Sequence, residues 1–421
     1  MTASIRGALC VSALLGIAAL PCRAQAITYD YPQVTCPSGA TTIAVGANIQ
    51  SALTAGTTGQ TFCLPAGVWH GQQFTPKSGQ KIIGDPNGGT VLTGDDTGYI
   101  YSSDGTADLG GVLIANIVIE HYRDDTSECS LGAIHGTNNW HFVNVTAQYN
   151  NCTGLNVGPN TVVSGGRFVA NKHAGIENGG SSGIVIQGAE IAYNNTRGDA
   201  QDNDAAGIKF GNTSNASVIN NWVHHNNANG IWIDVSSSNI IIDGNTVHDN
   251  ASTGIKYEIS TTGTIRDNVS LRNAGRQIEV SSSGNVSVYG NNVTCGDYNH
   301  QDCIIAQTDT GRGGADVGQN IVLKKNTVNF LDSGASKFGF LNYAGATSTG
   351  TTSNSNTFNV TATGQSHFVW NSHTTPGSFT TYKTWLSGLD SSSLEVANMG
   401  HVAGCQSMNC VGAGVSHITT P

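Results

Sequence analysis

Two carboxylates and two lysines recur at nearly constant intervals in the middle of the chain. Lys209 and Lys256 each follow a Gly-Ile pair, and Asp234 and Glu258 each end a phrase of the same kind. If these phrases stack as neighbouring strands, the two carboxylates are about 4.8 Å apart, close to the separation in retaining glycosidases. We expect Asp234 and Glu258 to divide the roles of nucleophile or base and general acid, with Lys256 tuning their acidity.

The same residues also fit a lyase. The carboxylates would then hold Ca²⁺ against a uronate carboxyl group, while Lys209 or Lys256 removes the C5 proton with Arg272 or Arg276 assisting. A polar insertion before Lys209 carries three further oxygen ligands that could hold calcium, namely Asp199, Asp202 and Asp204. A non-enzymatic alternative is a glycan-binding or adhesion shaft, in which the outward charges serve only solubility.

Other side chains near these positions are candidates for contacts with a polysaccharide. We expect Trp232 to be exposed and to offer a flat face to a sugar ring. Glu177, Glu279 and Arg276 are expected to make further contacts with the substrate. The pairs His224-His225 and His248-Asp249 are expected on turns or third strands, as surface residues away from this face.

A repeat positions these residues. The repeated phrases begin at glycines separated by 21, 32, 23, 24 and 21 residues, which are Gly154, Gly175, Gly207, Gly230, Gly254 and Gly275. Self-similarity at this period indicates a solenoid. Each unit contains three short runs of alternating apolar residues separated by polar turns, and Asn226, Asn250 and Asn273 recur at one of those turns. The pattern predicts an all-β, single-stranded parallel β-helix.

Aligning the units by their inward apolar residues predicts two outward rows. The first is His135, Asn156, Glu177, Lys209, Trp232, Lys256 and Gln277, and the second is Thr137, Gly158, Gly179, Gly211, Asp234, Glu258 and Glu279.

Segments at both ends extend this pattern. Residues 49–53 have the character of an amphipathic capping helix, residues 61–69 of a first strand and turn, and residues 379–394 of a terminal helix and turn. Because of these end segments and the predicted coils between them, the chain resembles the right-handed parallel β-helix, or pectin-lyase-like, superfamily. The resemblance implies an N-terminal cap at about 43–70, coils at about 71–375 and a C-terminal cap at about 376–421. That superfamily includes lyases, hydrolases, epimerases, esterases and binding shafts, and some of its lyases combine acidic calcium ligands with a lysine base.

The cysteines and the N-terminus indicate export. Residues 1–26 contain an early arginine, a short apolar run and a small-residue cleavage pattern, typical of a secretory signal, which leaves 27–421 as the β-helix domain. An even number of remaining cysteines favours disulfides. Equivalent places in successive coils predict a Cys129–Cys152 pair, and proximity in sequence suggests Cys36–Cys63, Cys295–Cys303 and Cys405–Cys410.

The composition of the chain limits the classes of partner that it can bind. The chain has 28 acidic and 18 basic residues, a formal charge of −10, and no basic tract. It is therefore a poor ligand for nucleic acid or anionic membranes. No segment after the signal approaches 18 apolar residues. We expect a secreted monomer with a polysaccharide partner, and calcium as the one cofactor to consider.

Overall fold

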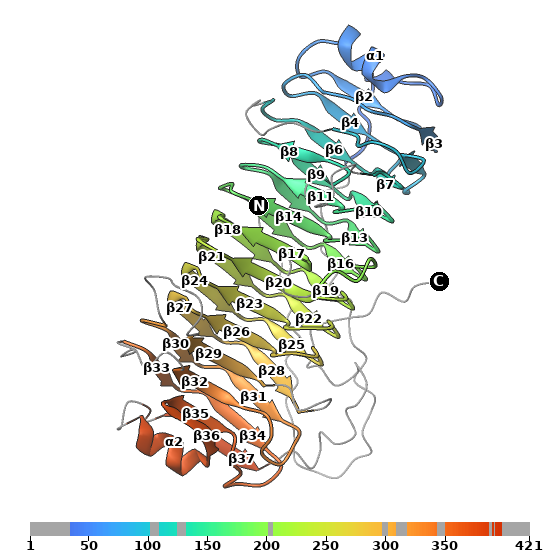
Figure 1. The fold of residues 1–421 in the computed structure, drawn as a ribbon. Coiled ribbons are helices and arrows are strands. Elements are labelled where there is room, and N and C mark those ends of the chain that lie inside the picture. The colour runs from blue at the N-terminus through green and yellow to red at the C-terminus, as the bar shows by residue number, and fades with distance from the viewer. Residues whose placement is uncertain are drawn as a thin grey trace, which may run out of the picture.

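The computed structural model describes residues 34–101, 109–123, 132–200, 205–296, 302–308, 318–342, 350–386, 390 and 392–397. Their strands form an elongated stack of coils that runs from the N-terminal to the C-terminal end of the chain (Figure 1). Successive coils contribute strands to three sheets, and neighbouring strands within each sheet are parallel, apart from one antiparallel pair at the C-terminal end.

Most coils contribute one strand to each sheet. The first sheet contains β1 (Thr41–Thr42), β2 (Thr61–Cys63), β4 (Lys81–Ile83), β6 (Leu113–Ala115), β9 (His141–Val143), β12 (Val162–Ser164), β15 (Val185–Gln187), β18 (Ser214–Ile219), β21 (Ser238–Asp243), β24 (Thr261–Arg266), β27 (Gly284–Tyr289), β30 (Val322–Lys324) and β33 (Thr352–Asn354). The second contains β3 (Gly67–His70), β5 (Thr90–Thr93), β7 (Val118–Glu120), β10 (Thr146–Gln148), β13 (Arg167–Val169), β16 (Glu190–Ala192), β19 (Trp222–His224), β22 (Thr246–His248), β25 (Val269–Leu271), β28 (Asn292–Cys295), β31 (Thr327–Phe330), β34 (Thr357–Val360) and β37 (Leu394–Ala397). The third contains β8 (His135–Thr137), β11 (Leu155–Val157), β14 (Ile176–Gly179), β17 (Ala206–Gly211), β20 (Asn229–Asp234), β23 (Ile255–Glu258), β26 (Ile278–Ser281), β29 (Ile304–Thr308), β32 (Phe338–Asn342), β35 (Phe368–Asn371) and β36 (His373–Gly377).

The core is a column of apolar side chains enclosed by the three sheets. Ile231 and Ile233 of β20 point inward and are fully buried, as are the equivalent Ile208 and Phe210 of β17. Period-two alternation places every second residue of a strand on the same face, so the residues between them point outward. The predicted parallel β-helix is confirmed.

Buried asparagines form a ladder beside this core. The side-chain amide of Asn226 donates to Asn250, and the amide of Asn250 donates to Asn273, at 2.9 and 2.8 Å. Stacked amides satisfy each other's polar groups along the axis. The stacking of these residues, expected from the sequence, is thereby confirmed.

Helices lie at both ends of the described coils. In α1 (Ile49–Ala55), Ile49 and Leu53 are buried, and the Asn48 side chain caps the first turn. In α2 (Phe379–Trp385), Tyr382 is buried and stacks on Phe368 with ring centroids 5.0 Å apart. Both helices were expected from the sequence. Strands β2 and β3 already lie within the segment assigned to the N-terminal cap.

The predicted outward rows need correction at Glu279 and Gln277. Lys256 pairs with Glu279 across β23 and β26, and Glu258 pairs with Ser281. Glu279 therefore belongs to the first outward row, beside Lys256, rather than to the second.

The reason lies in the turn before β26. Ile278 and Val280 are the fully buried inward pair of this strand, so the repeat here begins two residues later than the Gly275 phrase suggests. The side chain of Gln277, expected to point outward, is fully buried and accepts a hydrogen bond from the amide of Asn273, at the end of the asparagine ladder.

Two of the predicted disulfides are present. Cys36 is bonded to Cys63, and Cys295 to Cys303. Cys152 is also in a disulfide, while its expected partner Cys129 lies outside the described residues, as do Cys405, Cys410 and the predicted signal at 1–26. Among the described residues, neither helix has the length and apolar character needed to cross a bilayer.

Candidate functional site

Five side chains on the outer face of the third sheet form the candidate site, which we call the charged row: Lys209, Trp232, Asp234, Lys256 and Glu258. They come from three consecutive strands, β17, β20 and β23. The register aligns Lys209 with Trp232 and Trp232 with Lys256. The structure therefore brings together all five residues that the sequence grouped.

The two carboxylates occupy equivalent positions. Ile233 pairs with Tyr257, which places Asp234 and Glu258 at the next position of neighbouring strands, about 4.8 Å apart along the stack. Each has its own cation. Lys209 Nζ lies 2.8 Å from Asp234 Oδ2, and Lys256 Nζ lies 3.0 Å from Glu258 Oε2.

The two carboxylates differ in access to solvent. The Asp234 side chain is 15% exposed and the Glu258 side chain 4%. Glu258 is also held by the indole of Trp232, which donates to Oε2 over 3.1 Å. Asp234 also has a second partner, since its Oδ1 accepts a hydrogen bond from the Val235 amide over 2.7 Å. The two carboxylates thus differ in burial, with Glu258 the more buried and Asp234 the more accessible.

The prediction that Trp232 is exposed was wrong. Its exposed fraction is 2%. Lys209 Nζ lies 3.0 Å from the centroid of the indole ring, and Lys256 Nζ lies 4.8 Å from it. Because adjacent coils are only one strand spacing apart, the two lysines pack over the ring as cation–π partners. Trp232 is a structural support for the row rather than an open platform for sugars.

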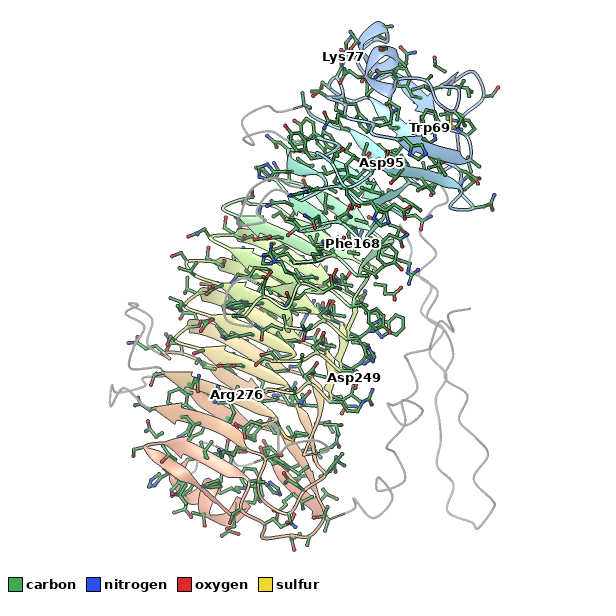
Figure 2. All side chains as sticks on the ribbon, turned by 45° about the vertical axis from the view of Figure 1, so that its right-hand side comes forward. Trp69, Lys77, Asp95, Phe168, Asp249 and Arg276 are labelled. Carbon is green, nitrogen blue, oxygen red and sulfur yellow. A yellow bond between two sulfur atoms is a disulfide. The ribbon has the colours of Figure 1, made fainter. Side chains whose placement is uncertain are left out.

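The charges continue at the C-terminal side of the row. Arg276 Nη1 lies 2.8 Å from Glu279 Oε1, and Arg276 Nε lies 3.6 Å from Asp302 Oδ2. Burial raises the pKa of Asp302 and outweighs the opposing effects of Lys337 and Arg276. Figure 2 shows Arg276 on the face of the stack. The structure thus joins Arg276 and Glu279 in one ion pair next to the charged row.

On the N-terminal side, Glu177 is the register neighbour of Lys209. Its Oε2 accepts a hydrogen bond from the Thr153 hydroxyl over 2.9 Å. Glu177 and Glu279 therefore flank the row at its two ends, as members of the first outward row.

The structure disfavours the predicted binding of calcium by Asp199. Its Oδ2 lies 2.8 Å from His173 Nδ1, and its Oδ1 lies 2.6 Å from Arg197 Nε. Burial raises the pKa of Asp199, but the bonds to Arg197 and His173 outweigh it and hold the pKa below the usual range. These partners of both oxygens disfavour a calcium ion at this carboxylate. Asp202 and Asp204 lie outside the described residues.

The structure contradicts the expected exposure of two histidines on the second sheet. His224 and His248, expected at the surface, are each 3% exposed. They are register neighbours, and their rings stack with centroids 5.1 Å apart. The sequence held a signal for this contact, since both histidines end third strands in successive coils and must therefore lie one above the other.

The polar groups of His248 are fully engaged. The Trp222 indole donates to Nε2 over 2.7 Å, and Nδ1 lies 2.6 Å from Asp249 Oδ2. Arg272 in turn donates to both oxygens of Asp249. Burial lowers the pKa of His248 to about 4, against the opposing effect of Asp249, so this ring is neutral at pH 7.

Within the described residues, His225, His248 and Asp249 are a group that could hold a metal, with one ligand atom from each lying within 4.8 Å of the others. A metal ion would have to replace the bonds from Trp222 and Arg272. The arrangement is better described as a closed hydrogen-bond chain.

Comparison with known proteins agrees with the geometry. The family model of the right-handed β-helix region matches residues 132–293. The solved structure of XylC in complex with xylose is 9% identical, with 77% of this chain and 82% of that chain covered and a TM-score of 0.59. The A-module of the mannuronan C-5 epimerase AlgE4 of Azotobacter vinelandii is 16% identical, with 82% and 93% covered and a TM-score of 0.47. No curated protein matches the sequence.

Three parallel sheets, the family model and the XylC structure together define a right-handed parallel β-helix protein. The chain therefore has the fold that its sequence pattern predicted, a right-handed parallel β-helix.

Proposed function

We propose that this protein is a secreted enzyme that hydrolyses glycosidic bonds in a polysaccharide bound along the outer face of the third sheet. The observation that carries the proposal is the placement of Asp234 and Glu258 at equivalent positions of neighbouring strands. One strand spacing, about 4.8 Å, is close to the carboxyl separation of about 5–5.5 Å in retaining glycosidases.

The surroundings of the two carboxylates suggest their roles. Glu258, fixed by Trp232 and Lys256, would attack the anomeric carbon as that carbon's bond to the leaving oxygen breaks. Asp234, the more exposed carboxylate, would deliver the proton to the leaving oxygen. Lys209 Nζ lies 2.8 Å from Asp234 Oδ2, so the Lys209 ammonium group can supply the proton that Asp234 passes to the leaving oxygen. Water would then attack the anomeric carbon and break its bond to Glu258, which releases the sugar and the Glu258 carboxylate, while the proton of the water returns through Asp234 to Lys209.

Flanking groups would position the polymer. Glu177 and Glu279 lie in the same outward row as Lys209 and Lys256, and Arg276 adds a guanidinium at one end. Hydroxyl groups of successive sugars can exchange hydrogen bonds with such a series of donors and acceptors. A chain running along the stack would therefore meet one row residue in each coil.

The test is to incubate the protein with neutral and uronate polysaccharides, with and without EDTA. New reducing ends and the ultraviolet absorbance of unsaturated uronates are followed together. Reducing ends without absorbance are the expected result. Absorbance that disappears with EDTA would identify a calcium-dependent lyase, and no product across the panel would favour a binding shaft.

Variants test whether residues of the charged row catalyse formation of the products. Asp234→Asn and Glu258→Gln should each lower the rate by about 10³-fold or more. An aryl glycoside with a good leaving group should restore much of the rate of Asp234→Asn but not of Glu258→Gln, since such a leaving group needs no proton. Asp243→Asn is the matched control. It removes an ion-paired carboxylate of the same coil, bonded to Arg266 over 2.6 Å, on the first sheet. Equal losses in all three variants would contradict the proposal.

A further inference from the structure

One edge of the stack carries unusual residues in left-handed backbone conformation. Seven of them, which we call the ridge, each follow a strand of the second sheet with φ between 52° and 58°: His121, Tyr149, Ala170, Tyr193, His225, Asp249 and Arg272. Because each occupies the same place in its coil, the seven residues form a line parallel to the stack. Figure 2 labels Asp249, one member of this line.

A second line of left-handed residues makes the ridge stand out. It lies where the chain enters the strands of the first sheet, and six of its members are Asn139, Asn160, Asn215, Asn239, Asn285 and Asn320. Glycine, asparagine, aspartate and histidine occur most readily in this conformation, while other residues such as tyrosine and alanine adopt it at a cost of roughly 1–2 kcal/mol each. Ile259, Thr262 and Lys325 adopt this conformation elsewhere, but among the described residues all the left-handed tyrosines and histidines lie on the ridge. This gathering of aromatic and imidazole groups on one line points to a function of their side chains.

The aromatic and imidazole side chains of the ridge are exposed, and their neighbours order them. Tyr149 is 53% exposed and Tyr193 51%. Tyr149 stacks on His121 with centroids 5.9 Å apart, and Tyr193 stacks on His225 at 5.2 Å. Two flat platforms, each made of a tyrosine and a histidine, therefore face the solvent.

The platforms have a defined spacing. β10, β13 and β16 are consecutive strands of the second sheet, so Tyr149 and Tyr193 are two strand spacings apart, about 10 Å. The small side chain of Ala170 lies between them. On the far side of His225, Arg272 and Asp249 form a bidentate ion pair that is only partly buried.

We propose that the ridge is a second carbohydrate-binding surface, on which rings of an extended polysaccharide stack against Tyr149 and Tyr193. The C–H face of a sugar ring matches the flat apolar face of tyrosine, and the phenol hydroxyl can bond to sugar hydroxyls. Asp249 and Arg272 supply an acceptor and donors for hydroxyls further along the chain. A polymer bound here runs parallel to the stack, as one on the charged row would.

The charge of the ridge selects against anionic polymers as ligands. Its one arginine is already paired with Asp249, which leaves little positive charge to hold phosphates. A neutral polysaccharide is the class of ligand that aromatic platforms with polar edges recognise. This proposal does not depend on catalysis at the charged row.

The test measures retention of the protein on insoluble polysaccharides and in gels that contain soluble ones. The ridge variant is Tyr149→Asn with Tyr193→Asn, because asparagine occupies the other left-handed line and suits this backbone. It should fold as well as the original protein and lose at least tenfold in affinity. Tyr99→Asn is the matched control, since Tyr99 is 39% exposed but lies outside the ridge, and it should retain the original affinity.

A third variant separates the ridge from the charged row. Asp234→Asn with Glu258→Gln should abolish products but leave retention intact. The ridge proposal is overturned if the Tyr149→Asn, Tyr193→Asn variant is retained normally, if retention is lost only in the charged-row variant, or if the unmodified protein is not retained by any polysaccharide. Loss of products with intact retention in the charged-row variant would support both proposals separately.

Discussion

The charged row and the ridge use outward-facing positions in opposite ways. In the charged row, Trp232 points away from the core yet is 2% exposed, beneath Lys209 and Lys256. In the ridge, Tyr193 is 51% exposed. Strands one spacing apart press long side chains of neighbouring coils onto one another, whereas side chains at a left-handed turn project from the edge. Direction relative to the core does not determine exposure in a solenoid.

Because of this difference, the charged row and the ridge suit different functions. A row of mutually paired charges holds its members in fixed positions, which suits chemistry on a bound substrate. An exposed line of platforms suits reversible binding of a polymer. Substitutions in the two regions should therefore differ in kind, with large effects on folding in the row and small ones on the ridge.

The largest difference is expected between two aromatic substitutions. Trp232→Ala should lower the free energy of unfolding by about 3–5 kcal/mol, since it empties a buried space and removes the ring beneath two lysines. Tyr193→Ala should cost about 1 kcal/mol or less, mostly from the lost stack with His225. Urea unfolding followed by circular dichroism measures both. Equal costs would contradict the contrast between the row and the ridge.

The next largest effect is expected from pH, through His248, which is buried and directly precedes the ridge residue Asp249. Burial lowers the pKa of His248 from its ordinary value of 6.5 to about 4, so the unfolded chain binds the proton more tightly. Stability from this residue is complete above about pH 6.5 and is lost as the pH falls toward 4. The shift corresponds to about 3 kcal/mol.

Unfolding measured between pH 7 and 4 tests this expectation. In the His248→Gln variant, the free energy of unfolding should change less steeply with pH between 7 and 4. Asp249 affects stability at a lower pH than His248 does. Burial raises its pKa, but His248 and Arg272 outweigh burial and hold it below the usual range, so its contribution is present above about pH 3.9 and is lost below it. A slope in His248→Gln as steep as in the original protein would show that another group controls the acid response.

Much of the fold could be predicted because its determinants are periodic. Ile231 and Ile233 alternate with outward residues, and Asn250 recurs at the interval of one coil, so sheets, coils and ladder followed from spacing alone. Glu279 was assigned to the wrong row because the phrase at Gly275 resembles the others although the buried pair comes later.

Exposure could not be predicted in the same way. The lysines that cover Trp232 are 23 and 24 residues away in sequence, and whether they pack on the ring depends on side-chain geometry rather than on pattern. The ridge could not be predicted either, because left-handed positions are normally recognised by asparagine or glycine, and Tyr149 and Tyr193 give no such signal.

The smallest expected effect tests the premise on which the ridge was recognised. Ala170 has a φ of 56°, which strains an alanine and not a glycine. Ala170→Gly should therefore raise the free energy of unfolding by about 0.5–1 kcal/mol, even though glycine gains more freedom in the unfolded chain. Ala192→Gly, in the buried strand β16 of the next coil, should lower it by about 1 kcal/mol. If Ala170→Gly is also destabilising, the ridge backbone is not strained, and its aromatic residues no longer need a function to explain why they are kept there.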